Sequence, residues 1–216
     1  MRIAPFFIAA LLSLTLASQA ATPQMEAALA AYESGDLALA AKRFTALSAQ
    51  QEPLADFNLA MMHLRAELPK PDLRLAQRLL LRAAAKGLVQ AELSLGYFHE
   101  QGVAGTPDLG QAVQWYSRAA KHGSSDGQVA LATAYYLGRG APLDMAQAAH
   151  WYREAAKGGD VGAQYLLASM YETGLGLAAD LRLARYWYDI AARNGDEAAP
   201  AKVKDLDKQL APDATT

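Results

Sequence analysis

The sequence predicts an all-helical protein, a solenoid of helix-turn-helix repeats that are 36 residues long. A Trp-Tyr pair recurs with this step at Trp115-Tyr116, Trp151-Tyr152 and Trp187-Tyr188. The same step joins Gly102 to Gly138 and Gly174. Within each unit, apolar residues recur at spacings of three and four, which is the period of an amphipathic helix. A fixed period of about 20 to 50 residues is the signature of a repeat architecture.

The first twenty residues, 1–20, have the pattern of a secretory signal peptide. Arg2 supplies a positive start, residues 3–16 are almost entirely apolar, and small residues stand at −3 and −1 of a cleavage site before Ala21. The apolar run is shorter than the ~20 residues that a membrane-spanning helix needs, although a retained anchor stays as the alternative. We therefore expect secretion across the inner membrane into the periplasm, with no stable membrane span after cleavage.

Seven further segments follow along the chain. Residues 21–52 form a degenerate N-terminal unit, with Gly35-Asp36, Ala40 and Phe44 as its markers. Residues 199–210 are expected to form a terminal capping helix with one face in water, because five of them are charged, Lys202, Lys204, Asp205, Asp207 and Lys208. Residues 211–216 are expected to be a disordered tail. The four full repeats between them are expected at about 53–90, 91–126, 127–162 and 163–198.

Each full repeat is expected to contain two helices. In the second repeat, Asp108 is placed to cap the second helix, and Gly123 to end it in the left-handed conformation. The first helix carries an inner stripe that includes Ala91, Leu95 and Phe98. One such hairpin cannot cover its own apolar face, so stability must come from stacking. We expect Trp151 to be a core residue of its repeat.

These residues carry a family resemblance. The unit with Gly102, Asp108, Trp115-Tyr116 and Gly123 resembles the Sel-one-like repeat family, which is related to the tetratricopeptide repeat, and residues 31–37 look like the shorter tetratricopeptide type. The resemblance implies a right-handed α-α superhelix whose concave wall, lined by the first helices, binds proteins or peptides. Exported bacterial members of the family resemble adaptors, assembly factors and regulators of envelope processes.

The chain departs from the repeat pattern at a few positions. Ala66 and Ala104 replace glycines, and His63 and His99 occupy a slot that is aromatic in later repeats. The two histidines are expected to fill that core slot. A metal pair is the alternative, although neither has another ligand residue at helical spacing.

The sequence contains no recognisable catalytic motif and no excess of basic residues. It has no cysteine, no serine-hydrolase or zinc-protease motif, and a formal charge of −2. We therefore expect no enzyme activity, no cofactor, no metal and no nucleic-acid partner. An accessory or catalytic protein acting on cell-wall material is the alternative function.

The predicted function is that of an exported scaffold, adaptor or regulator that binds a protein or peptide of the cell envelope. The candidate binding residues lie on the first helices, turned away from the inner stripe, and they vary between repeats while the core positions recur. Tyr97 and Tyr136 are the best anchors, because tyrosine buries a large area at low entropic cost. The eight candidates are Asn58, Met61, Tyr97, Glu100, Thr133, Tyr136, Ser169 and Glu172.

Overall fold

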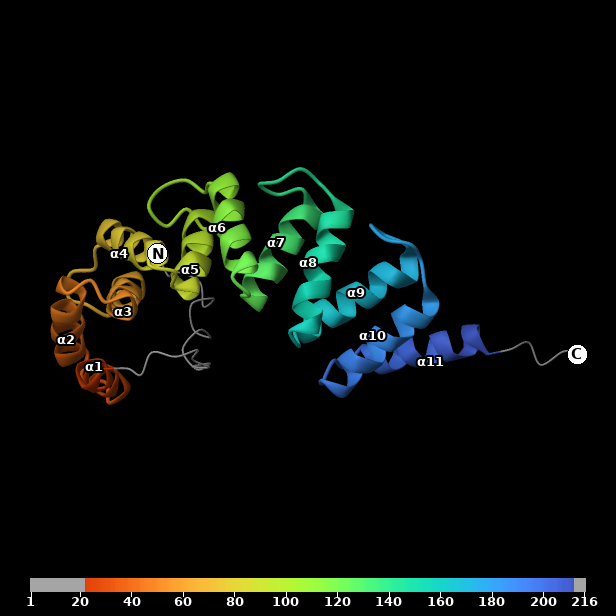
Figure 1. Ribbon diagram of the computed structural model, residues 1–216, viewed down its shortest axis with the longest axis horizontal. Coiled ribbons are helices and arrows are strands. Elements are labelled where there is room, and N and C mark those ends of the chain that lie inside the picture. The colour runs from red at the N-terminus through yellow and green to blue at the C-terminus, as the bar shows by residue number, and fades with distance from the viewer. Residues whose placement is uncertain (1–21, 212–216) are drawn as a thin grey trace, which may run out of the picture. The chain divides into compact units, whose positions relative to one another are not determined.

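The computed structural model describes residues 22–211, and every regular element in that range is an α-helix (Figure 1). The expected signal peptide and residues 212–216 of the expected tail lie outside the described residues. The chain divides into two compact units. The first runs to Phe98 and includes Val103–Gly105, and the second holds His99–Gly102 and the residues from Thr106 onward.

The first unit is a series of hairpins in which each of the first three helices packs on the next. The second helix of each hairpin begins after an aspartate that caps it. The Asp36 carboxylate accepts a hydrogen bond from the Leu39 N–H, and the Asp72 carboxylate accepts one from the Leu75 N–H. The helices of this unit are α1 (Pro23–Glu33), α2 (Leu37–Ala49), α3 (Pro53–Leu64), α4 (Leu73–Ala85) and α5 (Val89–Glu100), of which the last two residues fall in the second unit.

The second unit continues the same alternation of helices (Figure 1). Successive helices pack on one another from α6 to α11, and the exposed positions of α11 are mostly polar. The helices are α6 (Leu109–Lys121), α7 (Ser125–Leu137), α8 (Met145–Lys157), α9 (Val161–Thr173), α10 (Leu181–Arg193) and α11 (Ala199–Leu210). The α11 range equals that expected for the capping helix.

Asp108 caps α6 as expected, because its carboxylate accepts the Gln111 N–H at 2.9 Å. Gly123 follows α6 with φ of +86°, in the left-handed region that the sequence predicted. Two non-glycine residues within 22–211 share this conformation, Gln51 at φ +61° and Ala66 at φ +55°. Both stand at register positions where later repeats carry glycine.

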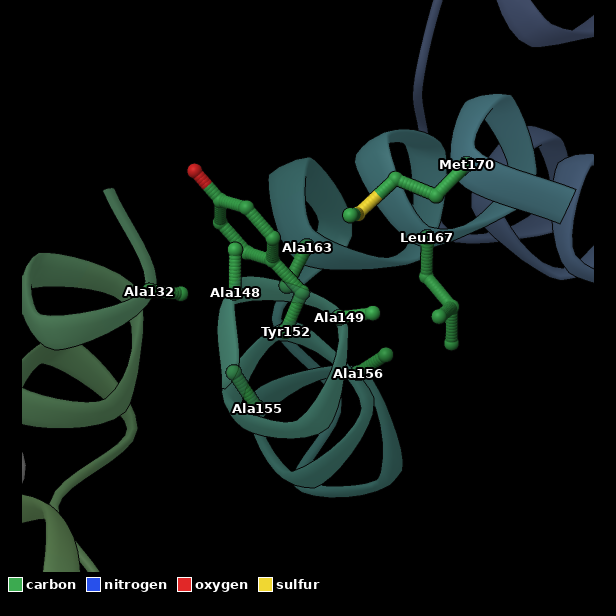
Figure 2. Close-up of a cluster of buried hydrophobic side chains, with 9 residues drawn as sticks. All are labelled: Ala132, Ala148, Ala149, Tyr152, Ala155, Ala156, Ala163, Leu167 and Met170. Atoms are coloured by element: carbon green, nitrogen blue, oxygen red, sulfur yellow. The ribbon is translucent and has the colours of Figure 1, made fainter. Parts of the chain in front are cut away.

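The core of each later repeat is built around the tyrosine of the Trp-Tyr pair, and the expectation for Trp151 was wrong. Tyr152 is buried among alanines of α8 and against Leu167 and Met170 of α9, as Figure 2 shows. Trp151 is only partly buried and packs on the edge of this cluster. The two neighbours point in different directions because successive residues of a helix are turned by about 100°.

The hairpin loops of the last two repeats press against the preceding repeat. A Cβ added at Gly176 would lie 2.0 Å from the carbonyl oxygen of Met145, at the start of α8. A Cβ at Gly140 would lie 2.3 Å from the carbonyl oxygen of Leu109, at the start of α6. Glycine is required at both loops, since the backbones approach too closely for a side chain and φ is +76° at each.

A polar contact joins each of three first helices to the helix before it. In α7 and α9, the Nε2 atoms of Gln128 and Gln164 donate to the carbonyl oxygens of Ala120 and Ala156, at 3.3 and 3.2 Å. The equivalent first-helix residue of α3 is Asp56, whose side chain is fully buried. A carboxylate cannot donate, and Arg82 supplies the donors instead.

Arg82 links three groups around the base of α3. Its guanidinium forms an ion pair with both carboxylate oxygens of Asp56. Its Nη2 also donates to the Ser48 carbonyl oxygen at 3.0 Å and to the Ser48 Oγ at 2.7 Å. Ser48 holds the register position of Ala120 and Ala156. The same carbonyl of the preceding helix is therefore satisfied in all three places, by Arg82 here and by a glutamine later.

Candidate protein-binding surface

The predicted binding residues fall mainly at two positions of the repeat register. Thr133 and Ser169 share the position of Met61 and Tyr97, and Tyr136 shares that of Glu100 and Glu172. The two positions are three residues apart, so in each helix they lie on neighbouring turns of one face.

In the first unit the structure places two of the three candidates inside. Asn58 is buried, and its Nδ2 donates to the Leu54 carbonyl oxygen at 2.8 Å within the same helix. Met61 is also buried, while Tyr97 is half-buried. Asn58 and Met61 therefore present little surface to a partner in this structure.

In the second unit the candidates surround the hydroxyl groups of the core tyrosines. The Thr133 Oγ1 lies 2.9 Å from the Tyr152 hydroxyl oxygen and donates to the Val129 carbonyl oxygen at 2.8 Å. Burial raises the pKa of Tyr152, and the hydrogen bond with Thr133 offsets part of that rise. The Tyr116 hydroxyl donates in the same way to the Glu100 carboxylate at 2.8 Å. Thr133 and Glu100 thus hold internal hydrogen bonds.

The last repeat carries the most elaborate version of this contact. The Tyr188 hydroxyl donates to the Glu172 carboxylate at 2.8 Å, and the Lys202 Nζ of α11 forms an ion pair with the same carboxylate at 3.0 Å. Burial, followed by the bond to Glu172, raises the pKa of Tyr188, and a hydrogen bond with Ser169 opposes that rise. Lys202 neutralises Glu172, so this part of the surface has no unbalanced charge.

Two residues of α9 beside these candidates were missed by the sequence analysis. Leu166 is 38% exposed, although it shares the register position of the buried Asn58. Tyr165 is half-buried and packs edge-on against the Tyr188 ring, with the ring centres 5.0 Å apart. Extending the Asn58 position by three repeats would have found Leu166. We define the first-helix surface as Thr133, Tyr136, Tyr165, Leu166, Ser169 and Glu172.

His63 is a buried residue of the first unit. Its Nδ1 accepts a hydrogen bond from the Asp72 backbone N–H at 3.0 Å. Burial lowers the pKa of His63, and the nearby Asp72 charge partly opposes the shift. In later repeats the equivalent aspartate N–H bonds to a backbone carbonyl, as Asp144 does to Tyr135. The His63 side chain therefore replaces a backbone acceptor. Across residues 22–211, no group of three or more His, Cys, Asp and Glu side chains is placed to hold a metal ion.

None of the helices between residues 22 and 211 has the length and apolar character needed to cross a bilayer.

The fold and surface define a helical solenoid of tandem α-hairpins. Its repeats have equivalent core residues and differ at the surface positions of their first helices. The model of the Sel1 repeat matches residues 53–88, 89–124, 125–160 and 161–196, which together are more than half of the chain. The chain belongs to the Sel1 repeat family. Proteins with these repeats generally mediate protein–protein interactions, and the fold is generally non-catalytic.

Solved structures support the assignment. A Sel1 repeat protein from Oxalobacter formigenes is 33% identical, with a TM-score of 0.72, over 78% of this chain and 49% of that one. A protective antigen of uropathogenic Escherichia coli strains, which displays an SLR fold, is 27% identical, with a TM-score of 0.82, over 88% of this chain and 42% of that one. The chain thus spans less than half the length of each. The comparison with curated proteins found no match.

Proposed function

We propose that this protein is an exported interaction scaffold of the cell envelope, and that it binds a protein or peptide through the first-helix surface of its last two repeats. The observation that carries the proposal is the contrast within these repeats. Tyr152 and Tyr188 keep the same core position, while the first-helix positions beside them change from Thr133 to Ser169 and from Tyr136 to Glu172. A repeated scaffold with a variable face is how solenoids specify partners.

The chemistry of the surface suggests what the partner presents. Leu166 is exposed, and Tyr136 and Tyr165 are half-buried, so aliphatic and aromatic groups are available for contact. Glu172 is already paired with Lys202. A partner segment with apolar anchors fits this surface better than a strongly charged one, because tyrosine and leucine contribute by area burial.

The N-terminal sequence supports the proposed envelope location. Residues 1–20 combine Arg2, an apolar run and small residues before Ala21, which is the pattern of a cleaved export signal. The chain also has no cysteine. It therefore needs no disulfide to fold in an oxidising compartment.

The test is a site-specific photo-crosslinker placed in the full chain in its native cell. A crosslinker at Leu166 is expected to give a defined adduct with one envelope protein. The matched control is the exposed Gln147 on α8, a second helix, where no such adduct is expected. The same adduct should weaken when Tyr136→Ala is added, at a temperature where circular dichroism verifies that the variant is folded, because Tyr136 also packs on the core cluster. Equal adducts from both positions, or none from Leu166, would place the binding surface elsewhere.

A further inference from the structure

An exposed apolar stripe runs along α10, away from the first-helix surface. Leu183 is 39% exposed and Tyr186 is 54% exposed, while Trp187 and Ile190 are half-buried. These residues follow one another at helical spacings of three and four, so their side chains form one continuous strip. The Tyr186 and Trp187 rings are in edge-on contact, with centres 5.4 Å apart.

The stripe is particular to the last repeat. In register with Leu183, Tyr186 and Ile190, the two preceding repeats carry polar side chains. These are Gln111, Gln114 and Arg118 on α6, and Gln147, His150 and Glu154 on α8. The repeat architecture alone does not require an apolar strip here, because α6 and α8 fold with polar residues at the same positions. Apolar side chains that are exposed together on one helix face can be covered by another protein surface.

The charges beside the stripe are of both signs. Arg182 is exposed near the start of α10, and Asp189 forms an ion pair with Arg193 at 2.6 Å near its end. An antiparallel copy of the same helix would therefore bring Arg182 beside Asp189, which it would share with Arg193. It would also oppose the two helix dipoles favourably.

We propose that the stripe binds the same stripe of a second copy of this chain, with the two α10 helices antiparallel. Leu183 and Ile190 lie at equal distances on either side of the midpoint between Tyr186 and Trp187. About a two-fold axis through that midpoint, Leu183 meets Ile190 of the second copy, while Tyr186 and Trp187, which lie on opposite flanks of the stripe, each meet the same residue of the second copy. The stripe is thus self-complementary, as a two-fold interface must be.

The charges follow the same axis. Arg182 and Asp189 lie on one flank of the stripe, by helical spacing. A two-fold axis perpendicular to antiparallel helices keeps each flank against itself. Arg182 then comes within about one turn of Asp189 of the second copy, and the pair forms twice.

The proposed contact between the two α10 helices buries a small area, so the dimer is expected to be weak. One helix from each copy buries less than the ~1,200 to 2,000 Å² of a stable interface. The dimer is therefore weak and concentration-dependent, with a Kd in the micromolar range or above. It does not rest on the proposed function, because it uses α10, whereas the first-helix surface lies on α7 and α9.

The first test is analytical ultracentrifugation of the protein purified from cells that express the full chain, from about 1 µM to about 1 mM. Wild type is expected to shift reversibly from monomer to dimer. Tyr186→Asp is expected to weaken the dimer at least tenfold, because it places an unpaired charge in the stripe. The control is His150→Asp, at the same register position of α8, which should dimerise as wild type does. Circular dichroism verifies that both variants are folded.

The second test fixes the orientation, using the absence of native cysteine. Leu183→Cys chains mixed with Ile190→Cys chains are expected to form disulfide-linked pairs under mild oxidation. Each variant alone should not, since its own thiols would be about 10 Å apart along the helices.

Three results would overturn the proposal. They are a monomer at every concentration, a dimer that Tyr186→Asp leaves intact, and crosslinking of Leu183→Cys chains with each other in preference to the mixture. A stripe that is covered by a different protein in the cell would give the first of these results.

Discussion

Gln51 and Ala66 have a positive backbone φ, which residues with a Cβ atom rarely adopt. Both lie at positive φ at the ends of helices, where Gly87 and Gly102 stand one repeat later. The left-handed conformation costs a residue with a Cβ about 1–2 kcal/mol. These two positions of the chain thus retain the repeat geometry without the residue that favours it.

Ala66→Gly is expected to raise the free energy of unfolding by about 0.5–1 kcal/mol. Relief of the backbone strain exceeds the ~0.4–1 kcal/mol that glycine loses through the freer unfolded chain. Urea unfolding measures the change. Ala104→Gly is the control, since Ala104 also replaces a register glycine but is not among the positive-φ residues. It should show no gain, and equal stabilisation by both changes would contradict the strain at Ala66.

His63 is expected to make the fold sensitive to mild acid. Burial lowers its pKa below the ordinary value of 6.5, so the folded state binds a proton less readily than the unfolded chain does. Its contribution is fully present above pH 6.5 and is lost as the pH falls from there toward the lower pKa of the folded state. The urea concentration at the unfolding midpoint should therefore be lower at pH 5.5 than at pH 7.5. The decrease should begin near pH ~6.5, the ordinary pKa of histidine.

Two histidine variants isolate this effect. His63→Gln removes the titrating group, so its urea midpoint should change less between the two pH values than that of wild type. The exposed His150, replaced by glutamine, should leave the wild-type drop in place. If His63→Gln kept the full drop, another group would be responsible.

At the scale of the helix, the two residues of the Trp-Tyr pair contribute differently to stability, because the tyrosine lies in the core and the tryptophan lies at its edge. Tyr152→Ala is expected to lower the free energy of unfolding by about 3–5 kcal/mol, because it empties a buried site. Trp151→Ala should cost less, about 1–2 kcal/mol, because the ring is only partly buried. Tyr152→Phe removes only the bond to Thr133 and should cost about 0.5–1.5 kcal/mol. A larger loss for Trp151→Ala than for Tyr152→Ala in chemical denaturation would reverse this ranking.

The contact between loop and preceding helix gives a second prediction at this scale. Gly176→Ala is expected to destabilise the protein by about 2–4 kcal/mol, from the clash with the Met145 carbonyl and from positive φ. Gly162→Ala is the matched control, because a Cβ there meets only Asp160 Oδ1, at 3.5 Å. It should raise the free energy of unfolding by ~0.5–1 kcal/mol. Loss of stability in both variants alike would argue against the close approach at Gly176.

The sequence predicted the helices well because their boundaries depend on local chemistry. Asp108 and Gly123 act through their own backbone, so spacing alone identified them. Trp151 was misassigned because size suggested burial, whereas the direction of a side chain depends on the turn of the helix. Leu166 was missed because it matches Asn58 in register and differs from it in burial. The burial of a first-helix residue depends on the side chains that pack beside it. Those side chains differ between repeats, so the register position alone does not predict burial.

At the scale of the molecule, the fold class followed from the 36-residue period, and the family match and the solved relatives confirm a helical Sel1 repeat solenoid. The internal bonds of Thr133, Glu100 and Glu172 were not predictable. They join helices through side chains whose partners are set by packing.

Export gives the prediction that belongs to the whole chain. We expect the envelope fraction to contain a protein whose N-terminal residue is Ala21, because residues 1–20 carry the features of a cleaved signal. N-terminal sequencing of the fractionated protein measures this. A chain lacking residues 2–20 should stay in the cytoplasm. An envelope form that keeps Arg2 would show a retained anchor instead.

The donor that Gln128 and Gln164 provide has a consequence for how such an array changes length during evolution. Each glutamine bonds to a main-chain carbonyl of the preceding helix, an atom that every repeat possesses whatever its sequence. Duplication or loss of a unit such as 161–196 therefore leaves no buried polar group stranded. Asp56 depends on Arg82 and on Ser48 of the preceding unit. The 53–88 repeat therefore depends on the unit before it for its buried polar group, whereas the 125–160 and 161–196 repeats need only a main-chain carbonyl there.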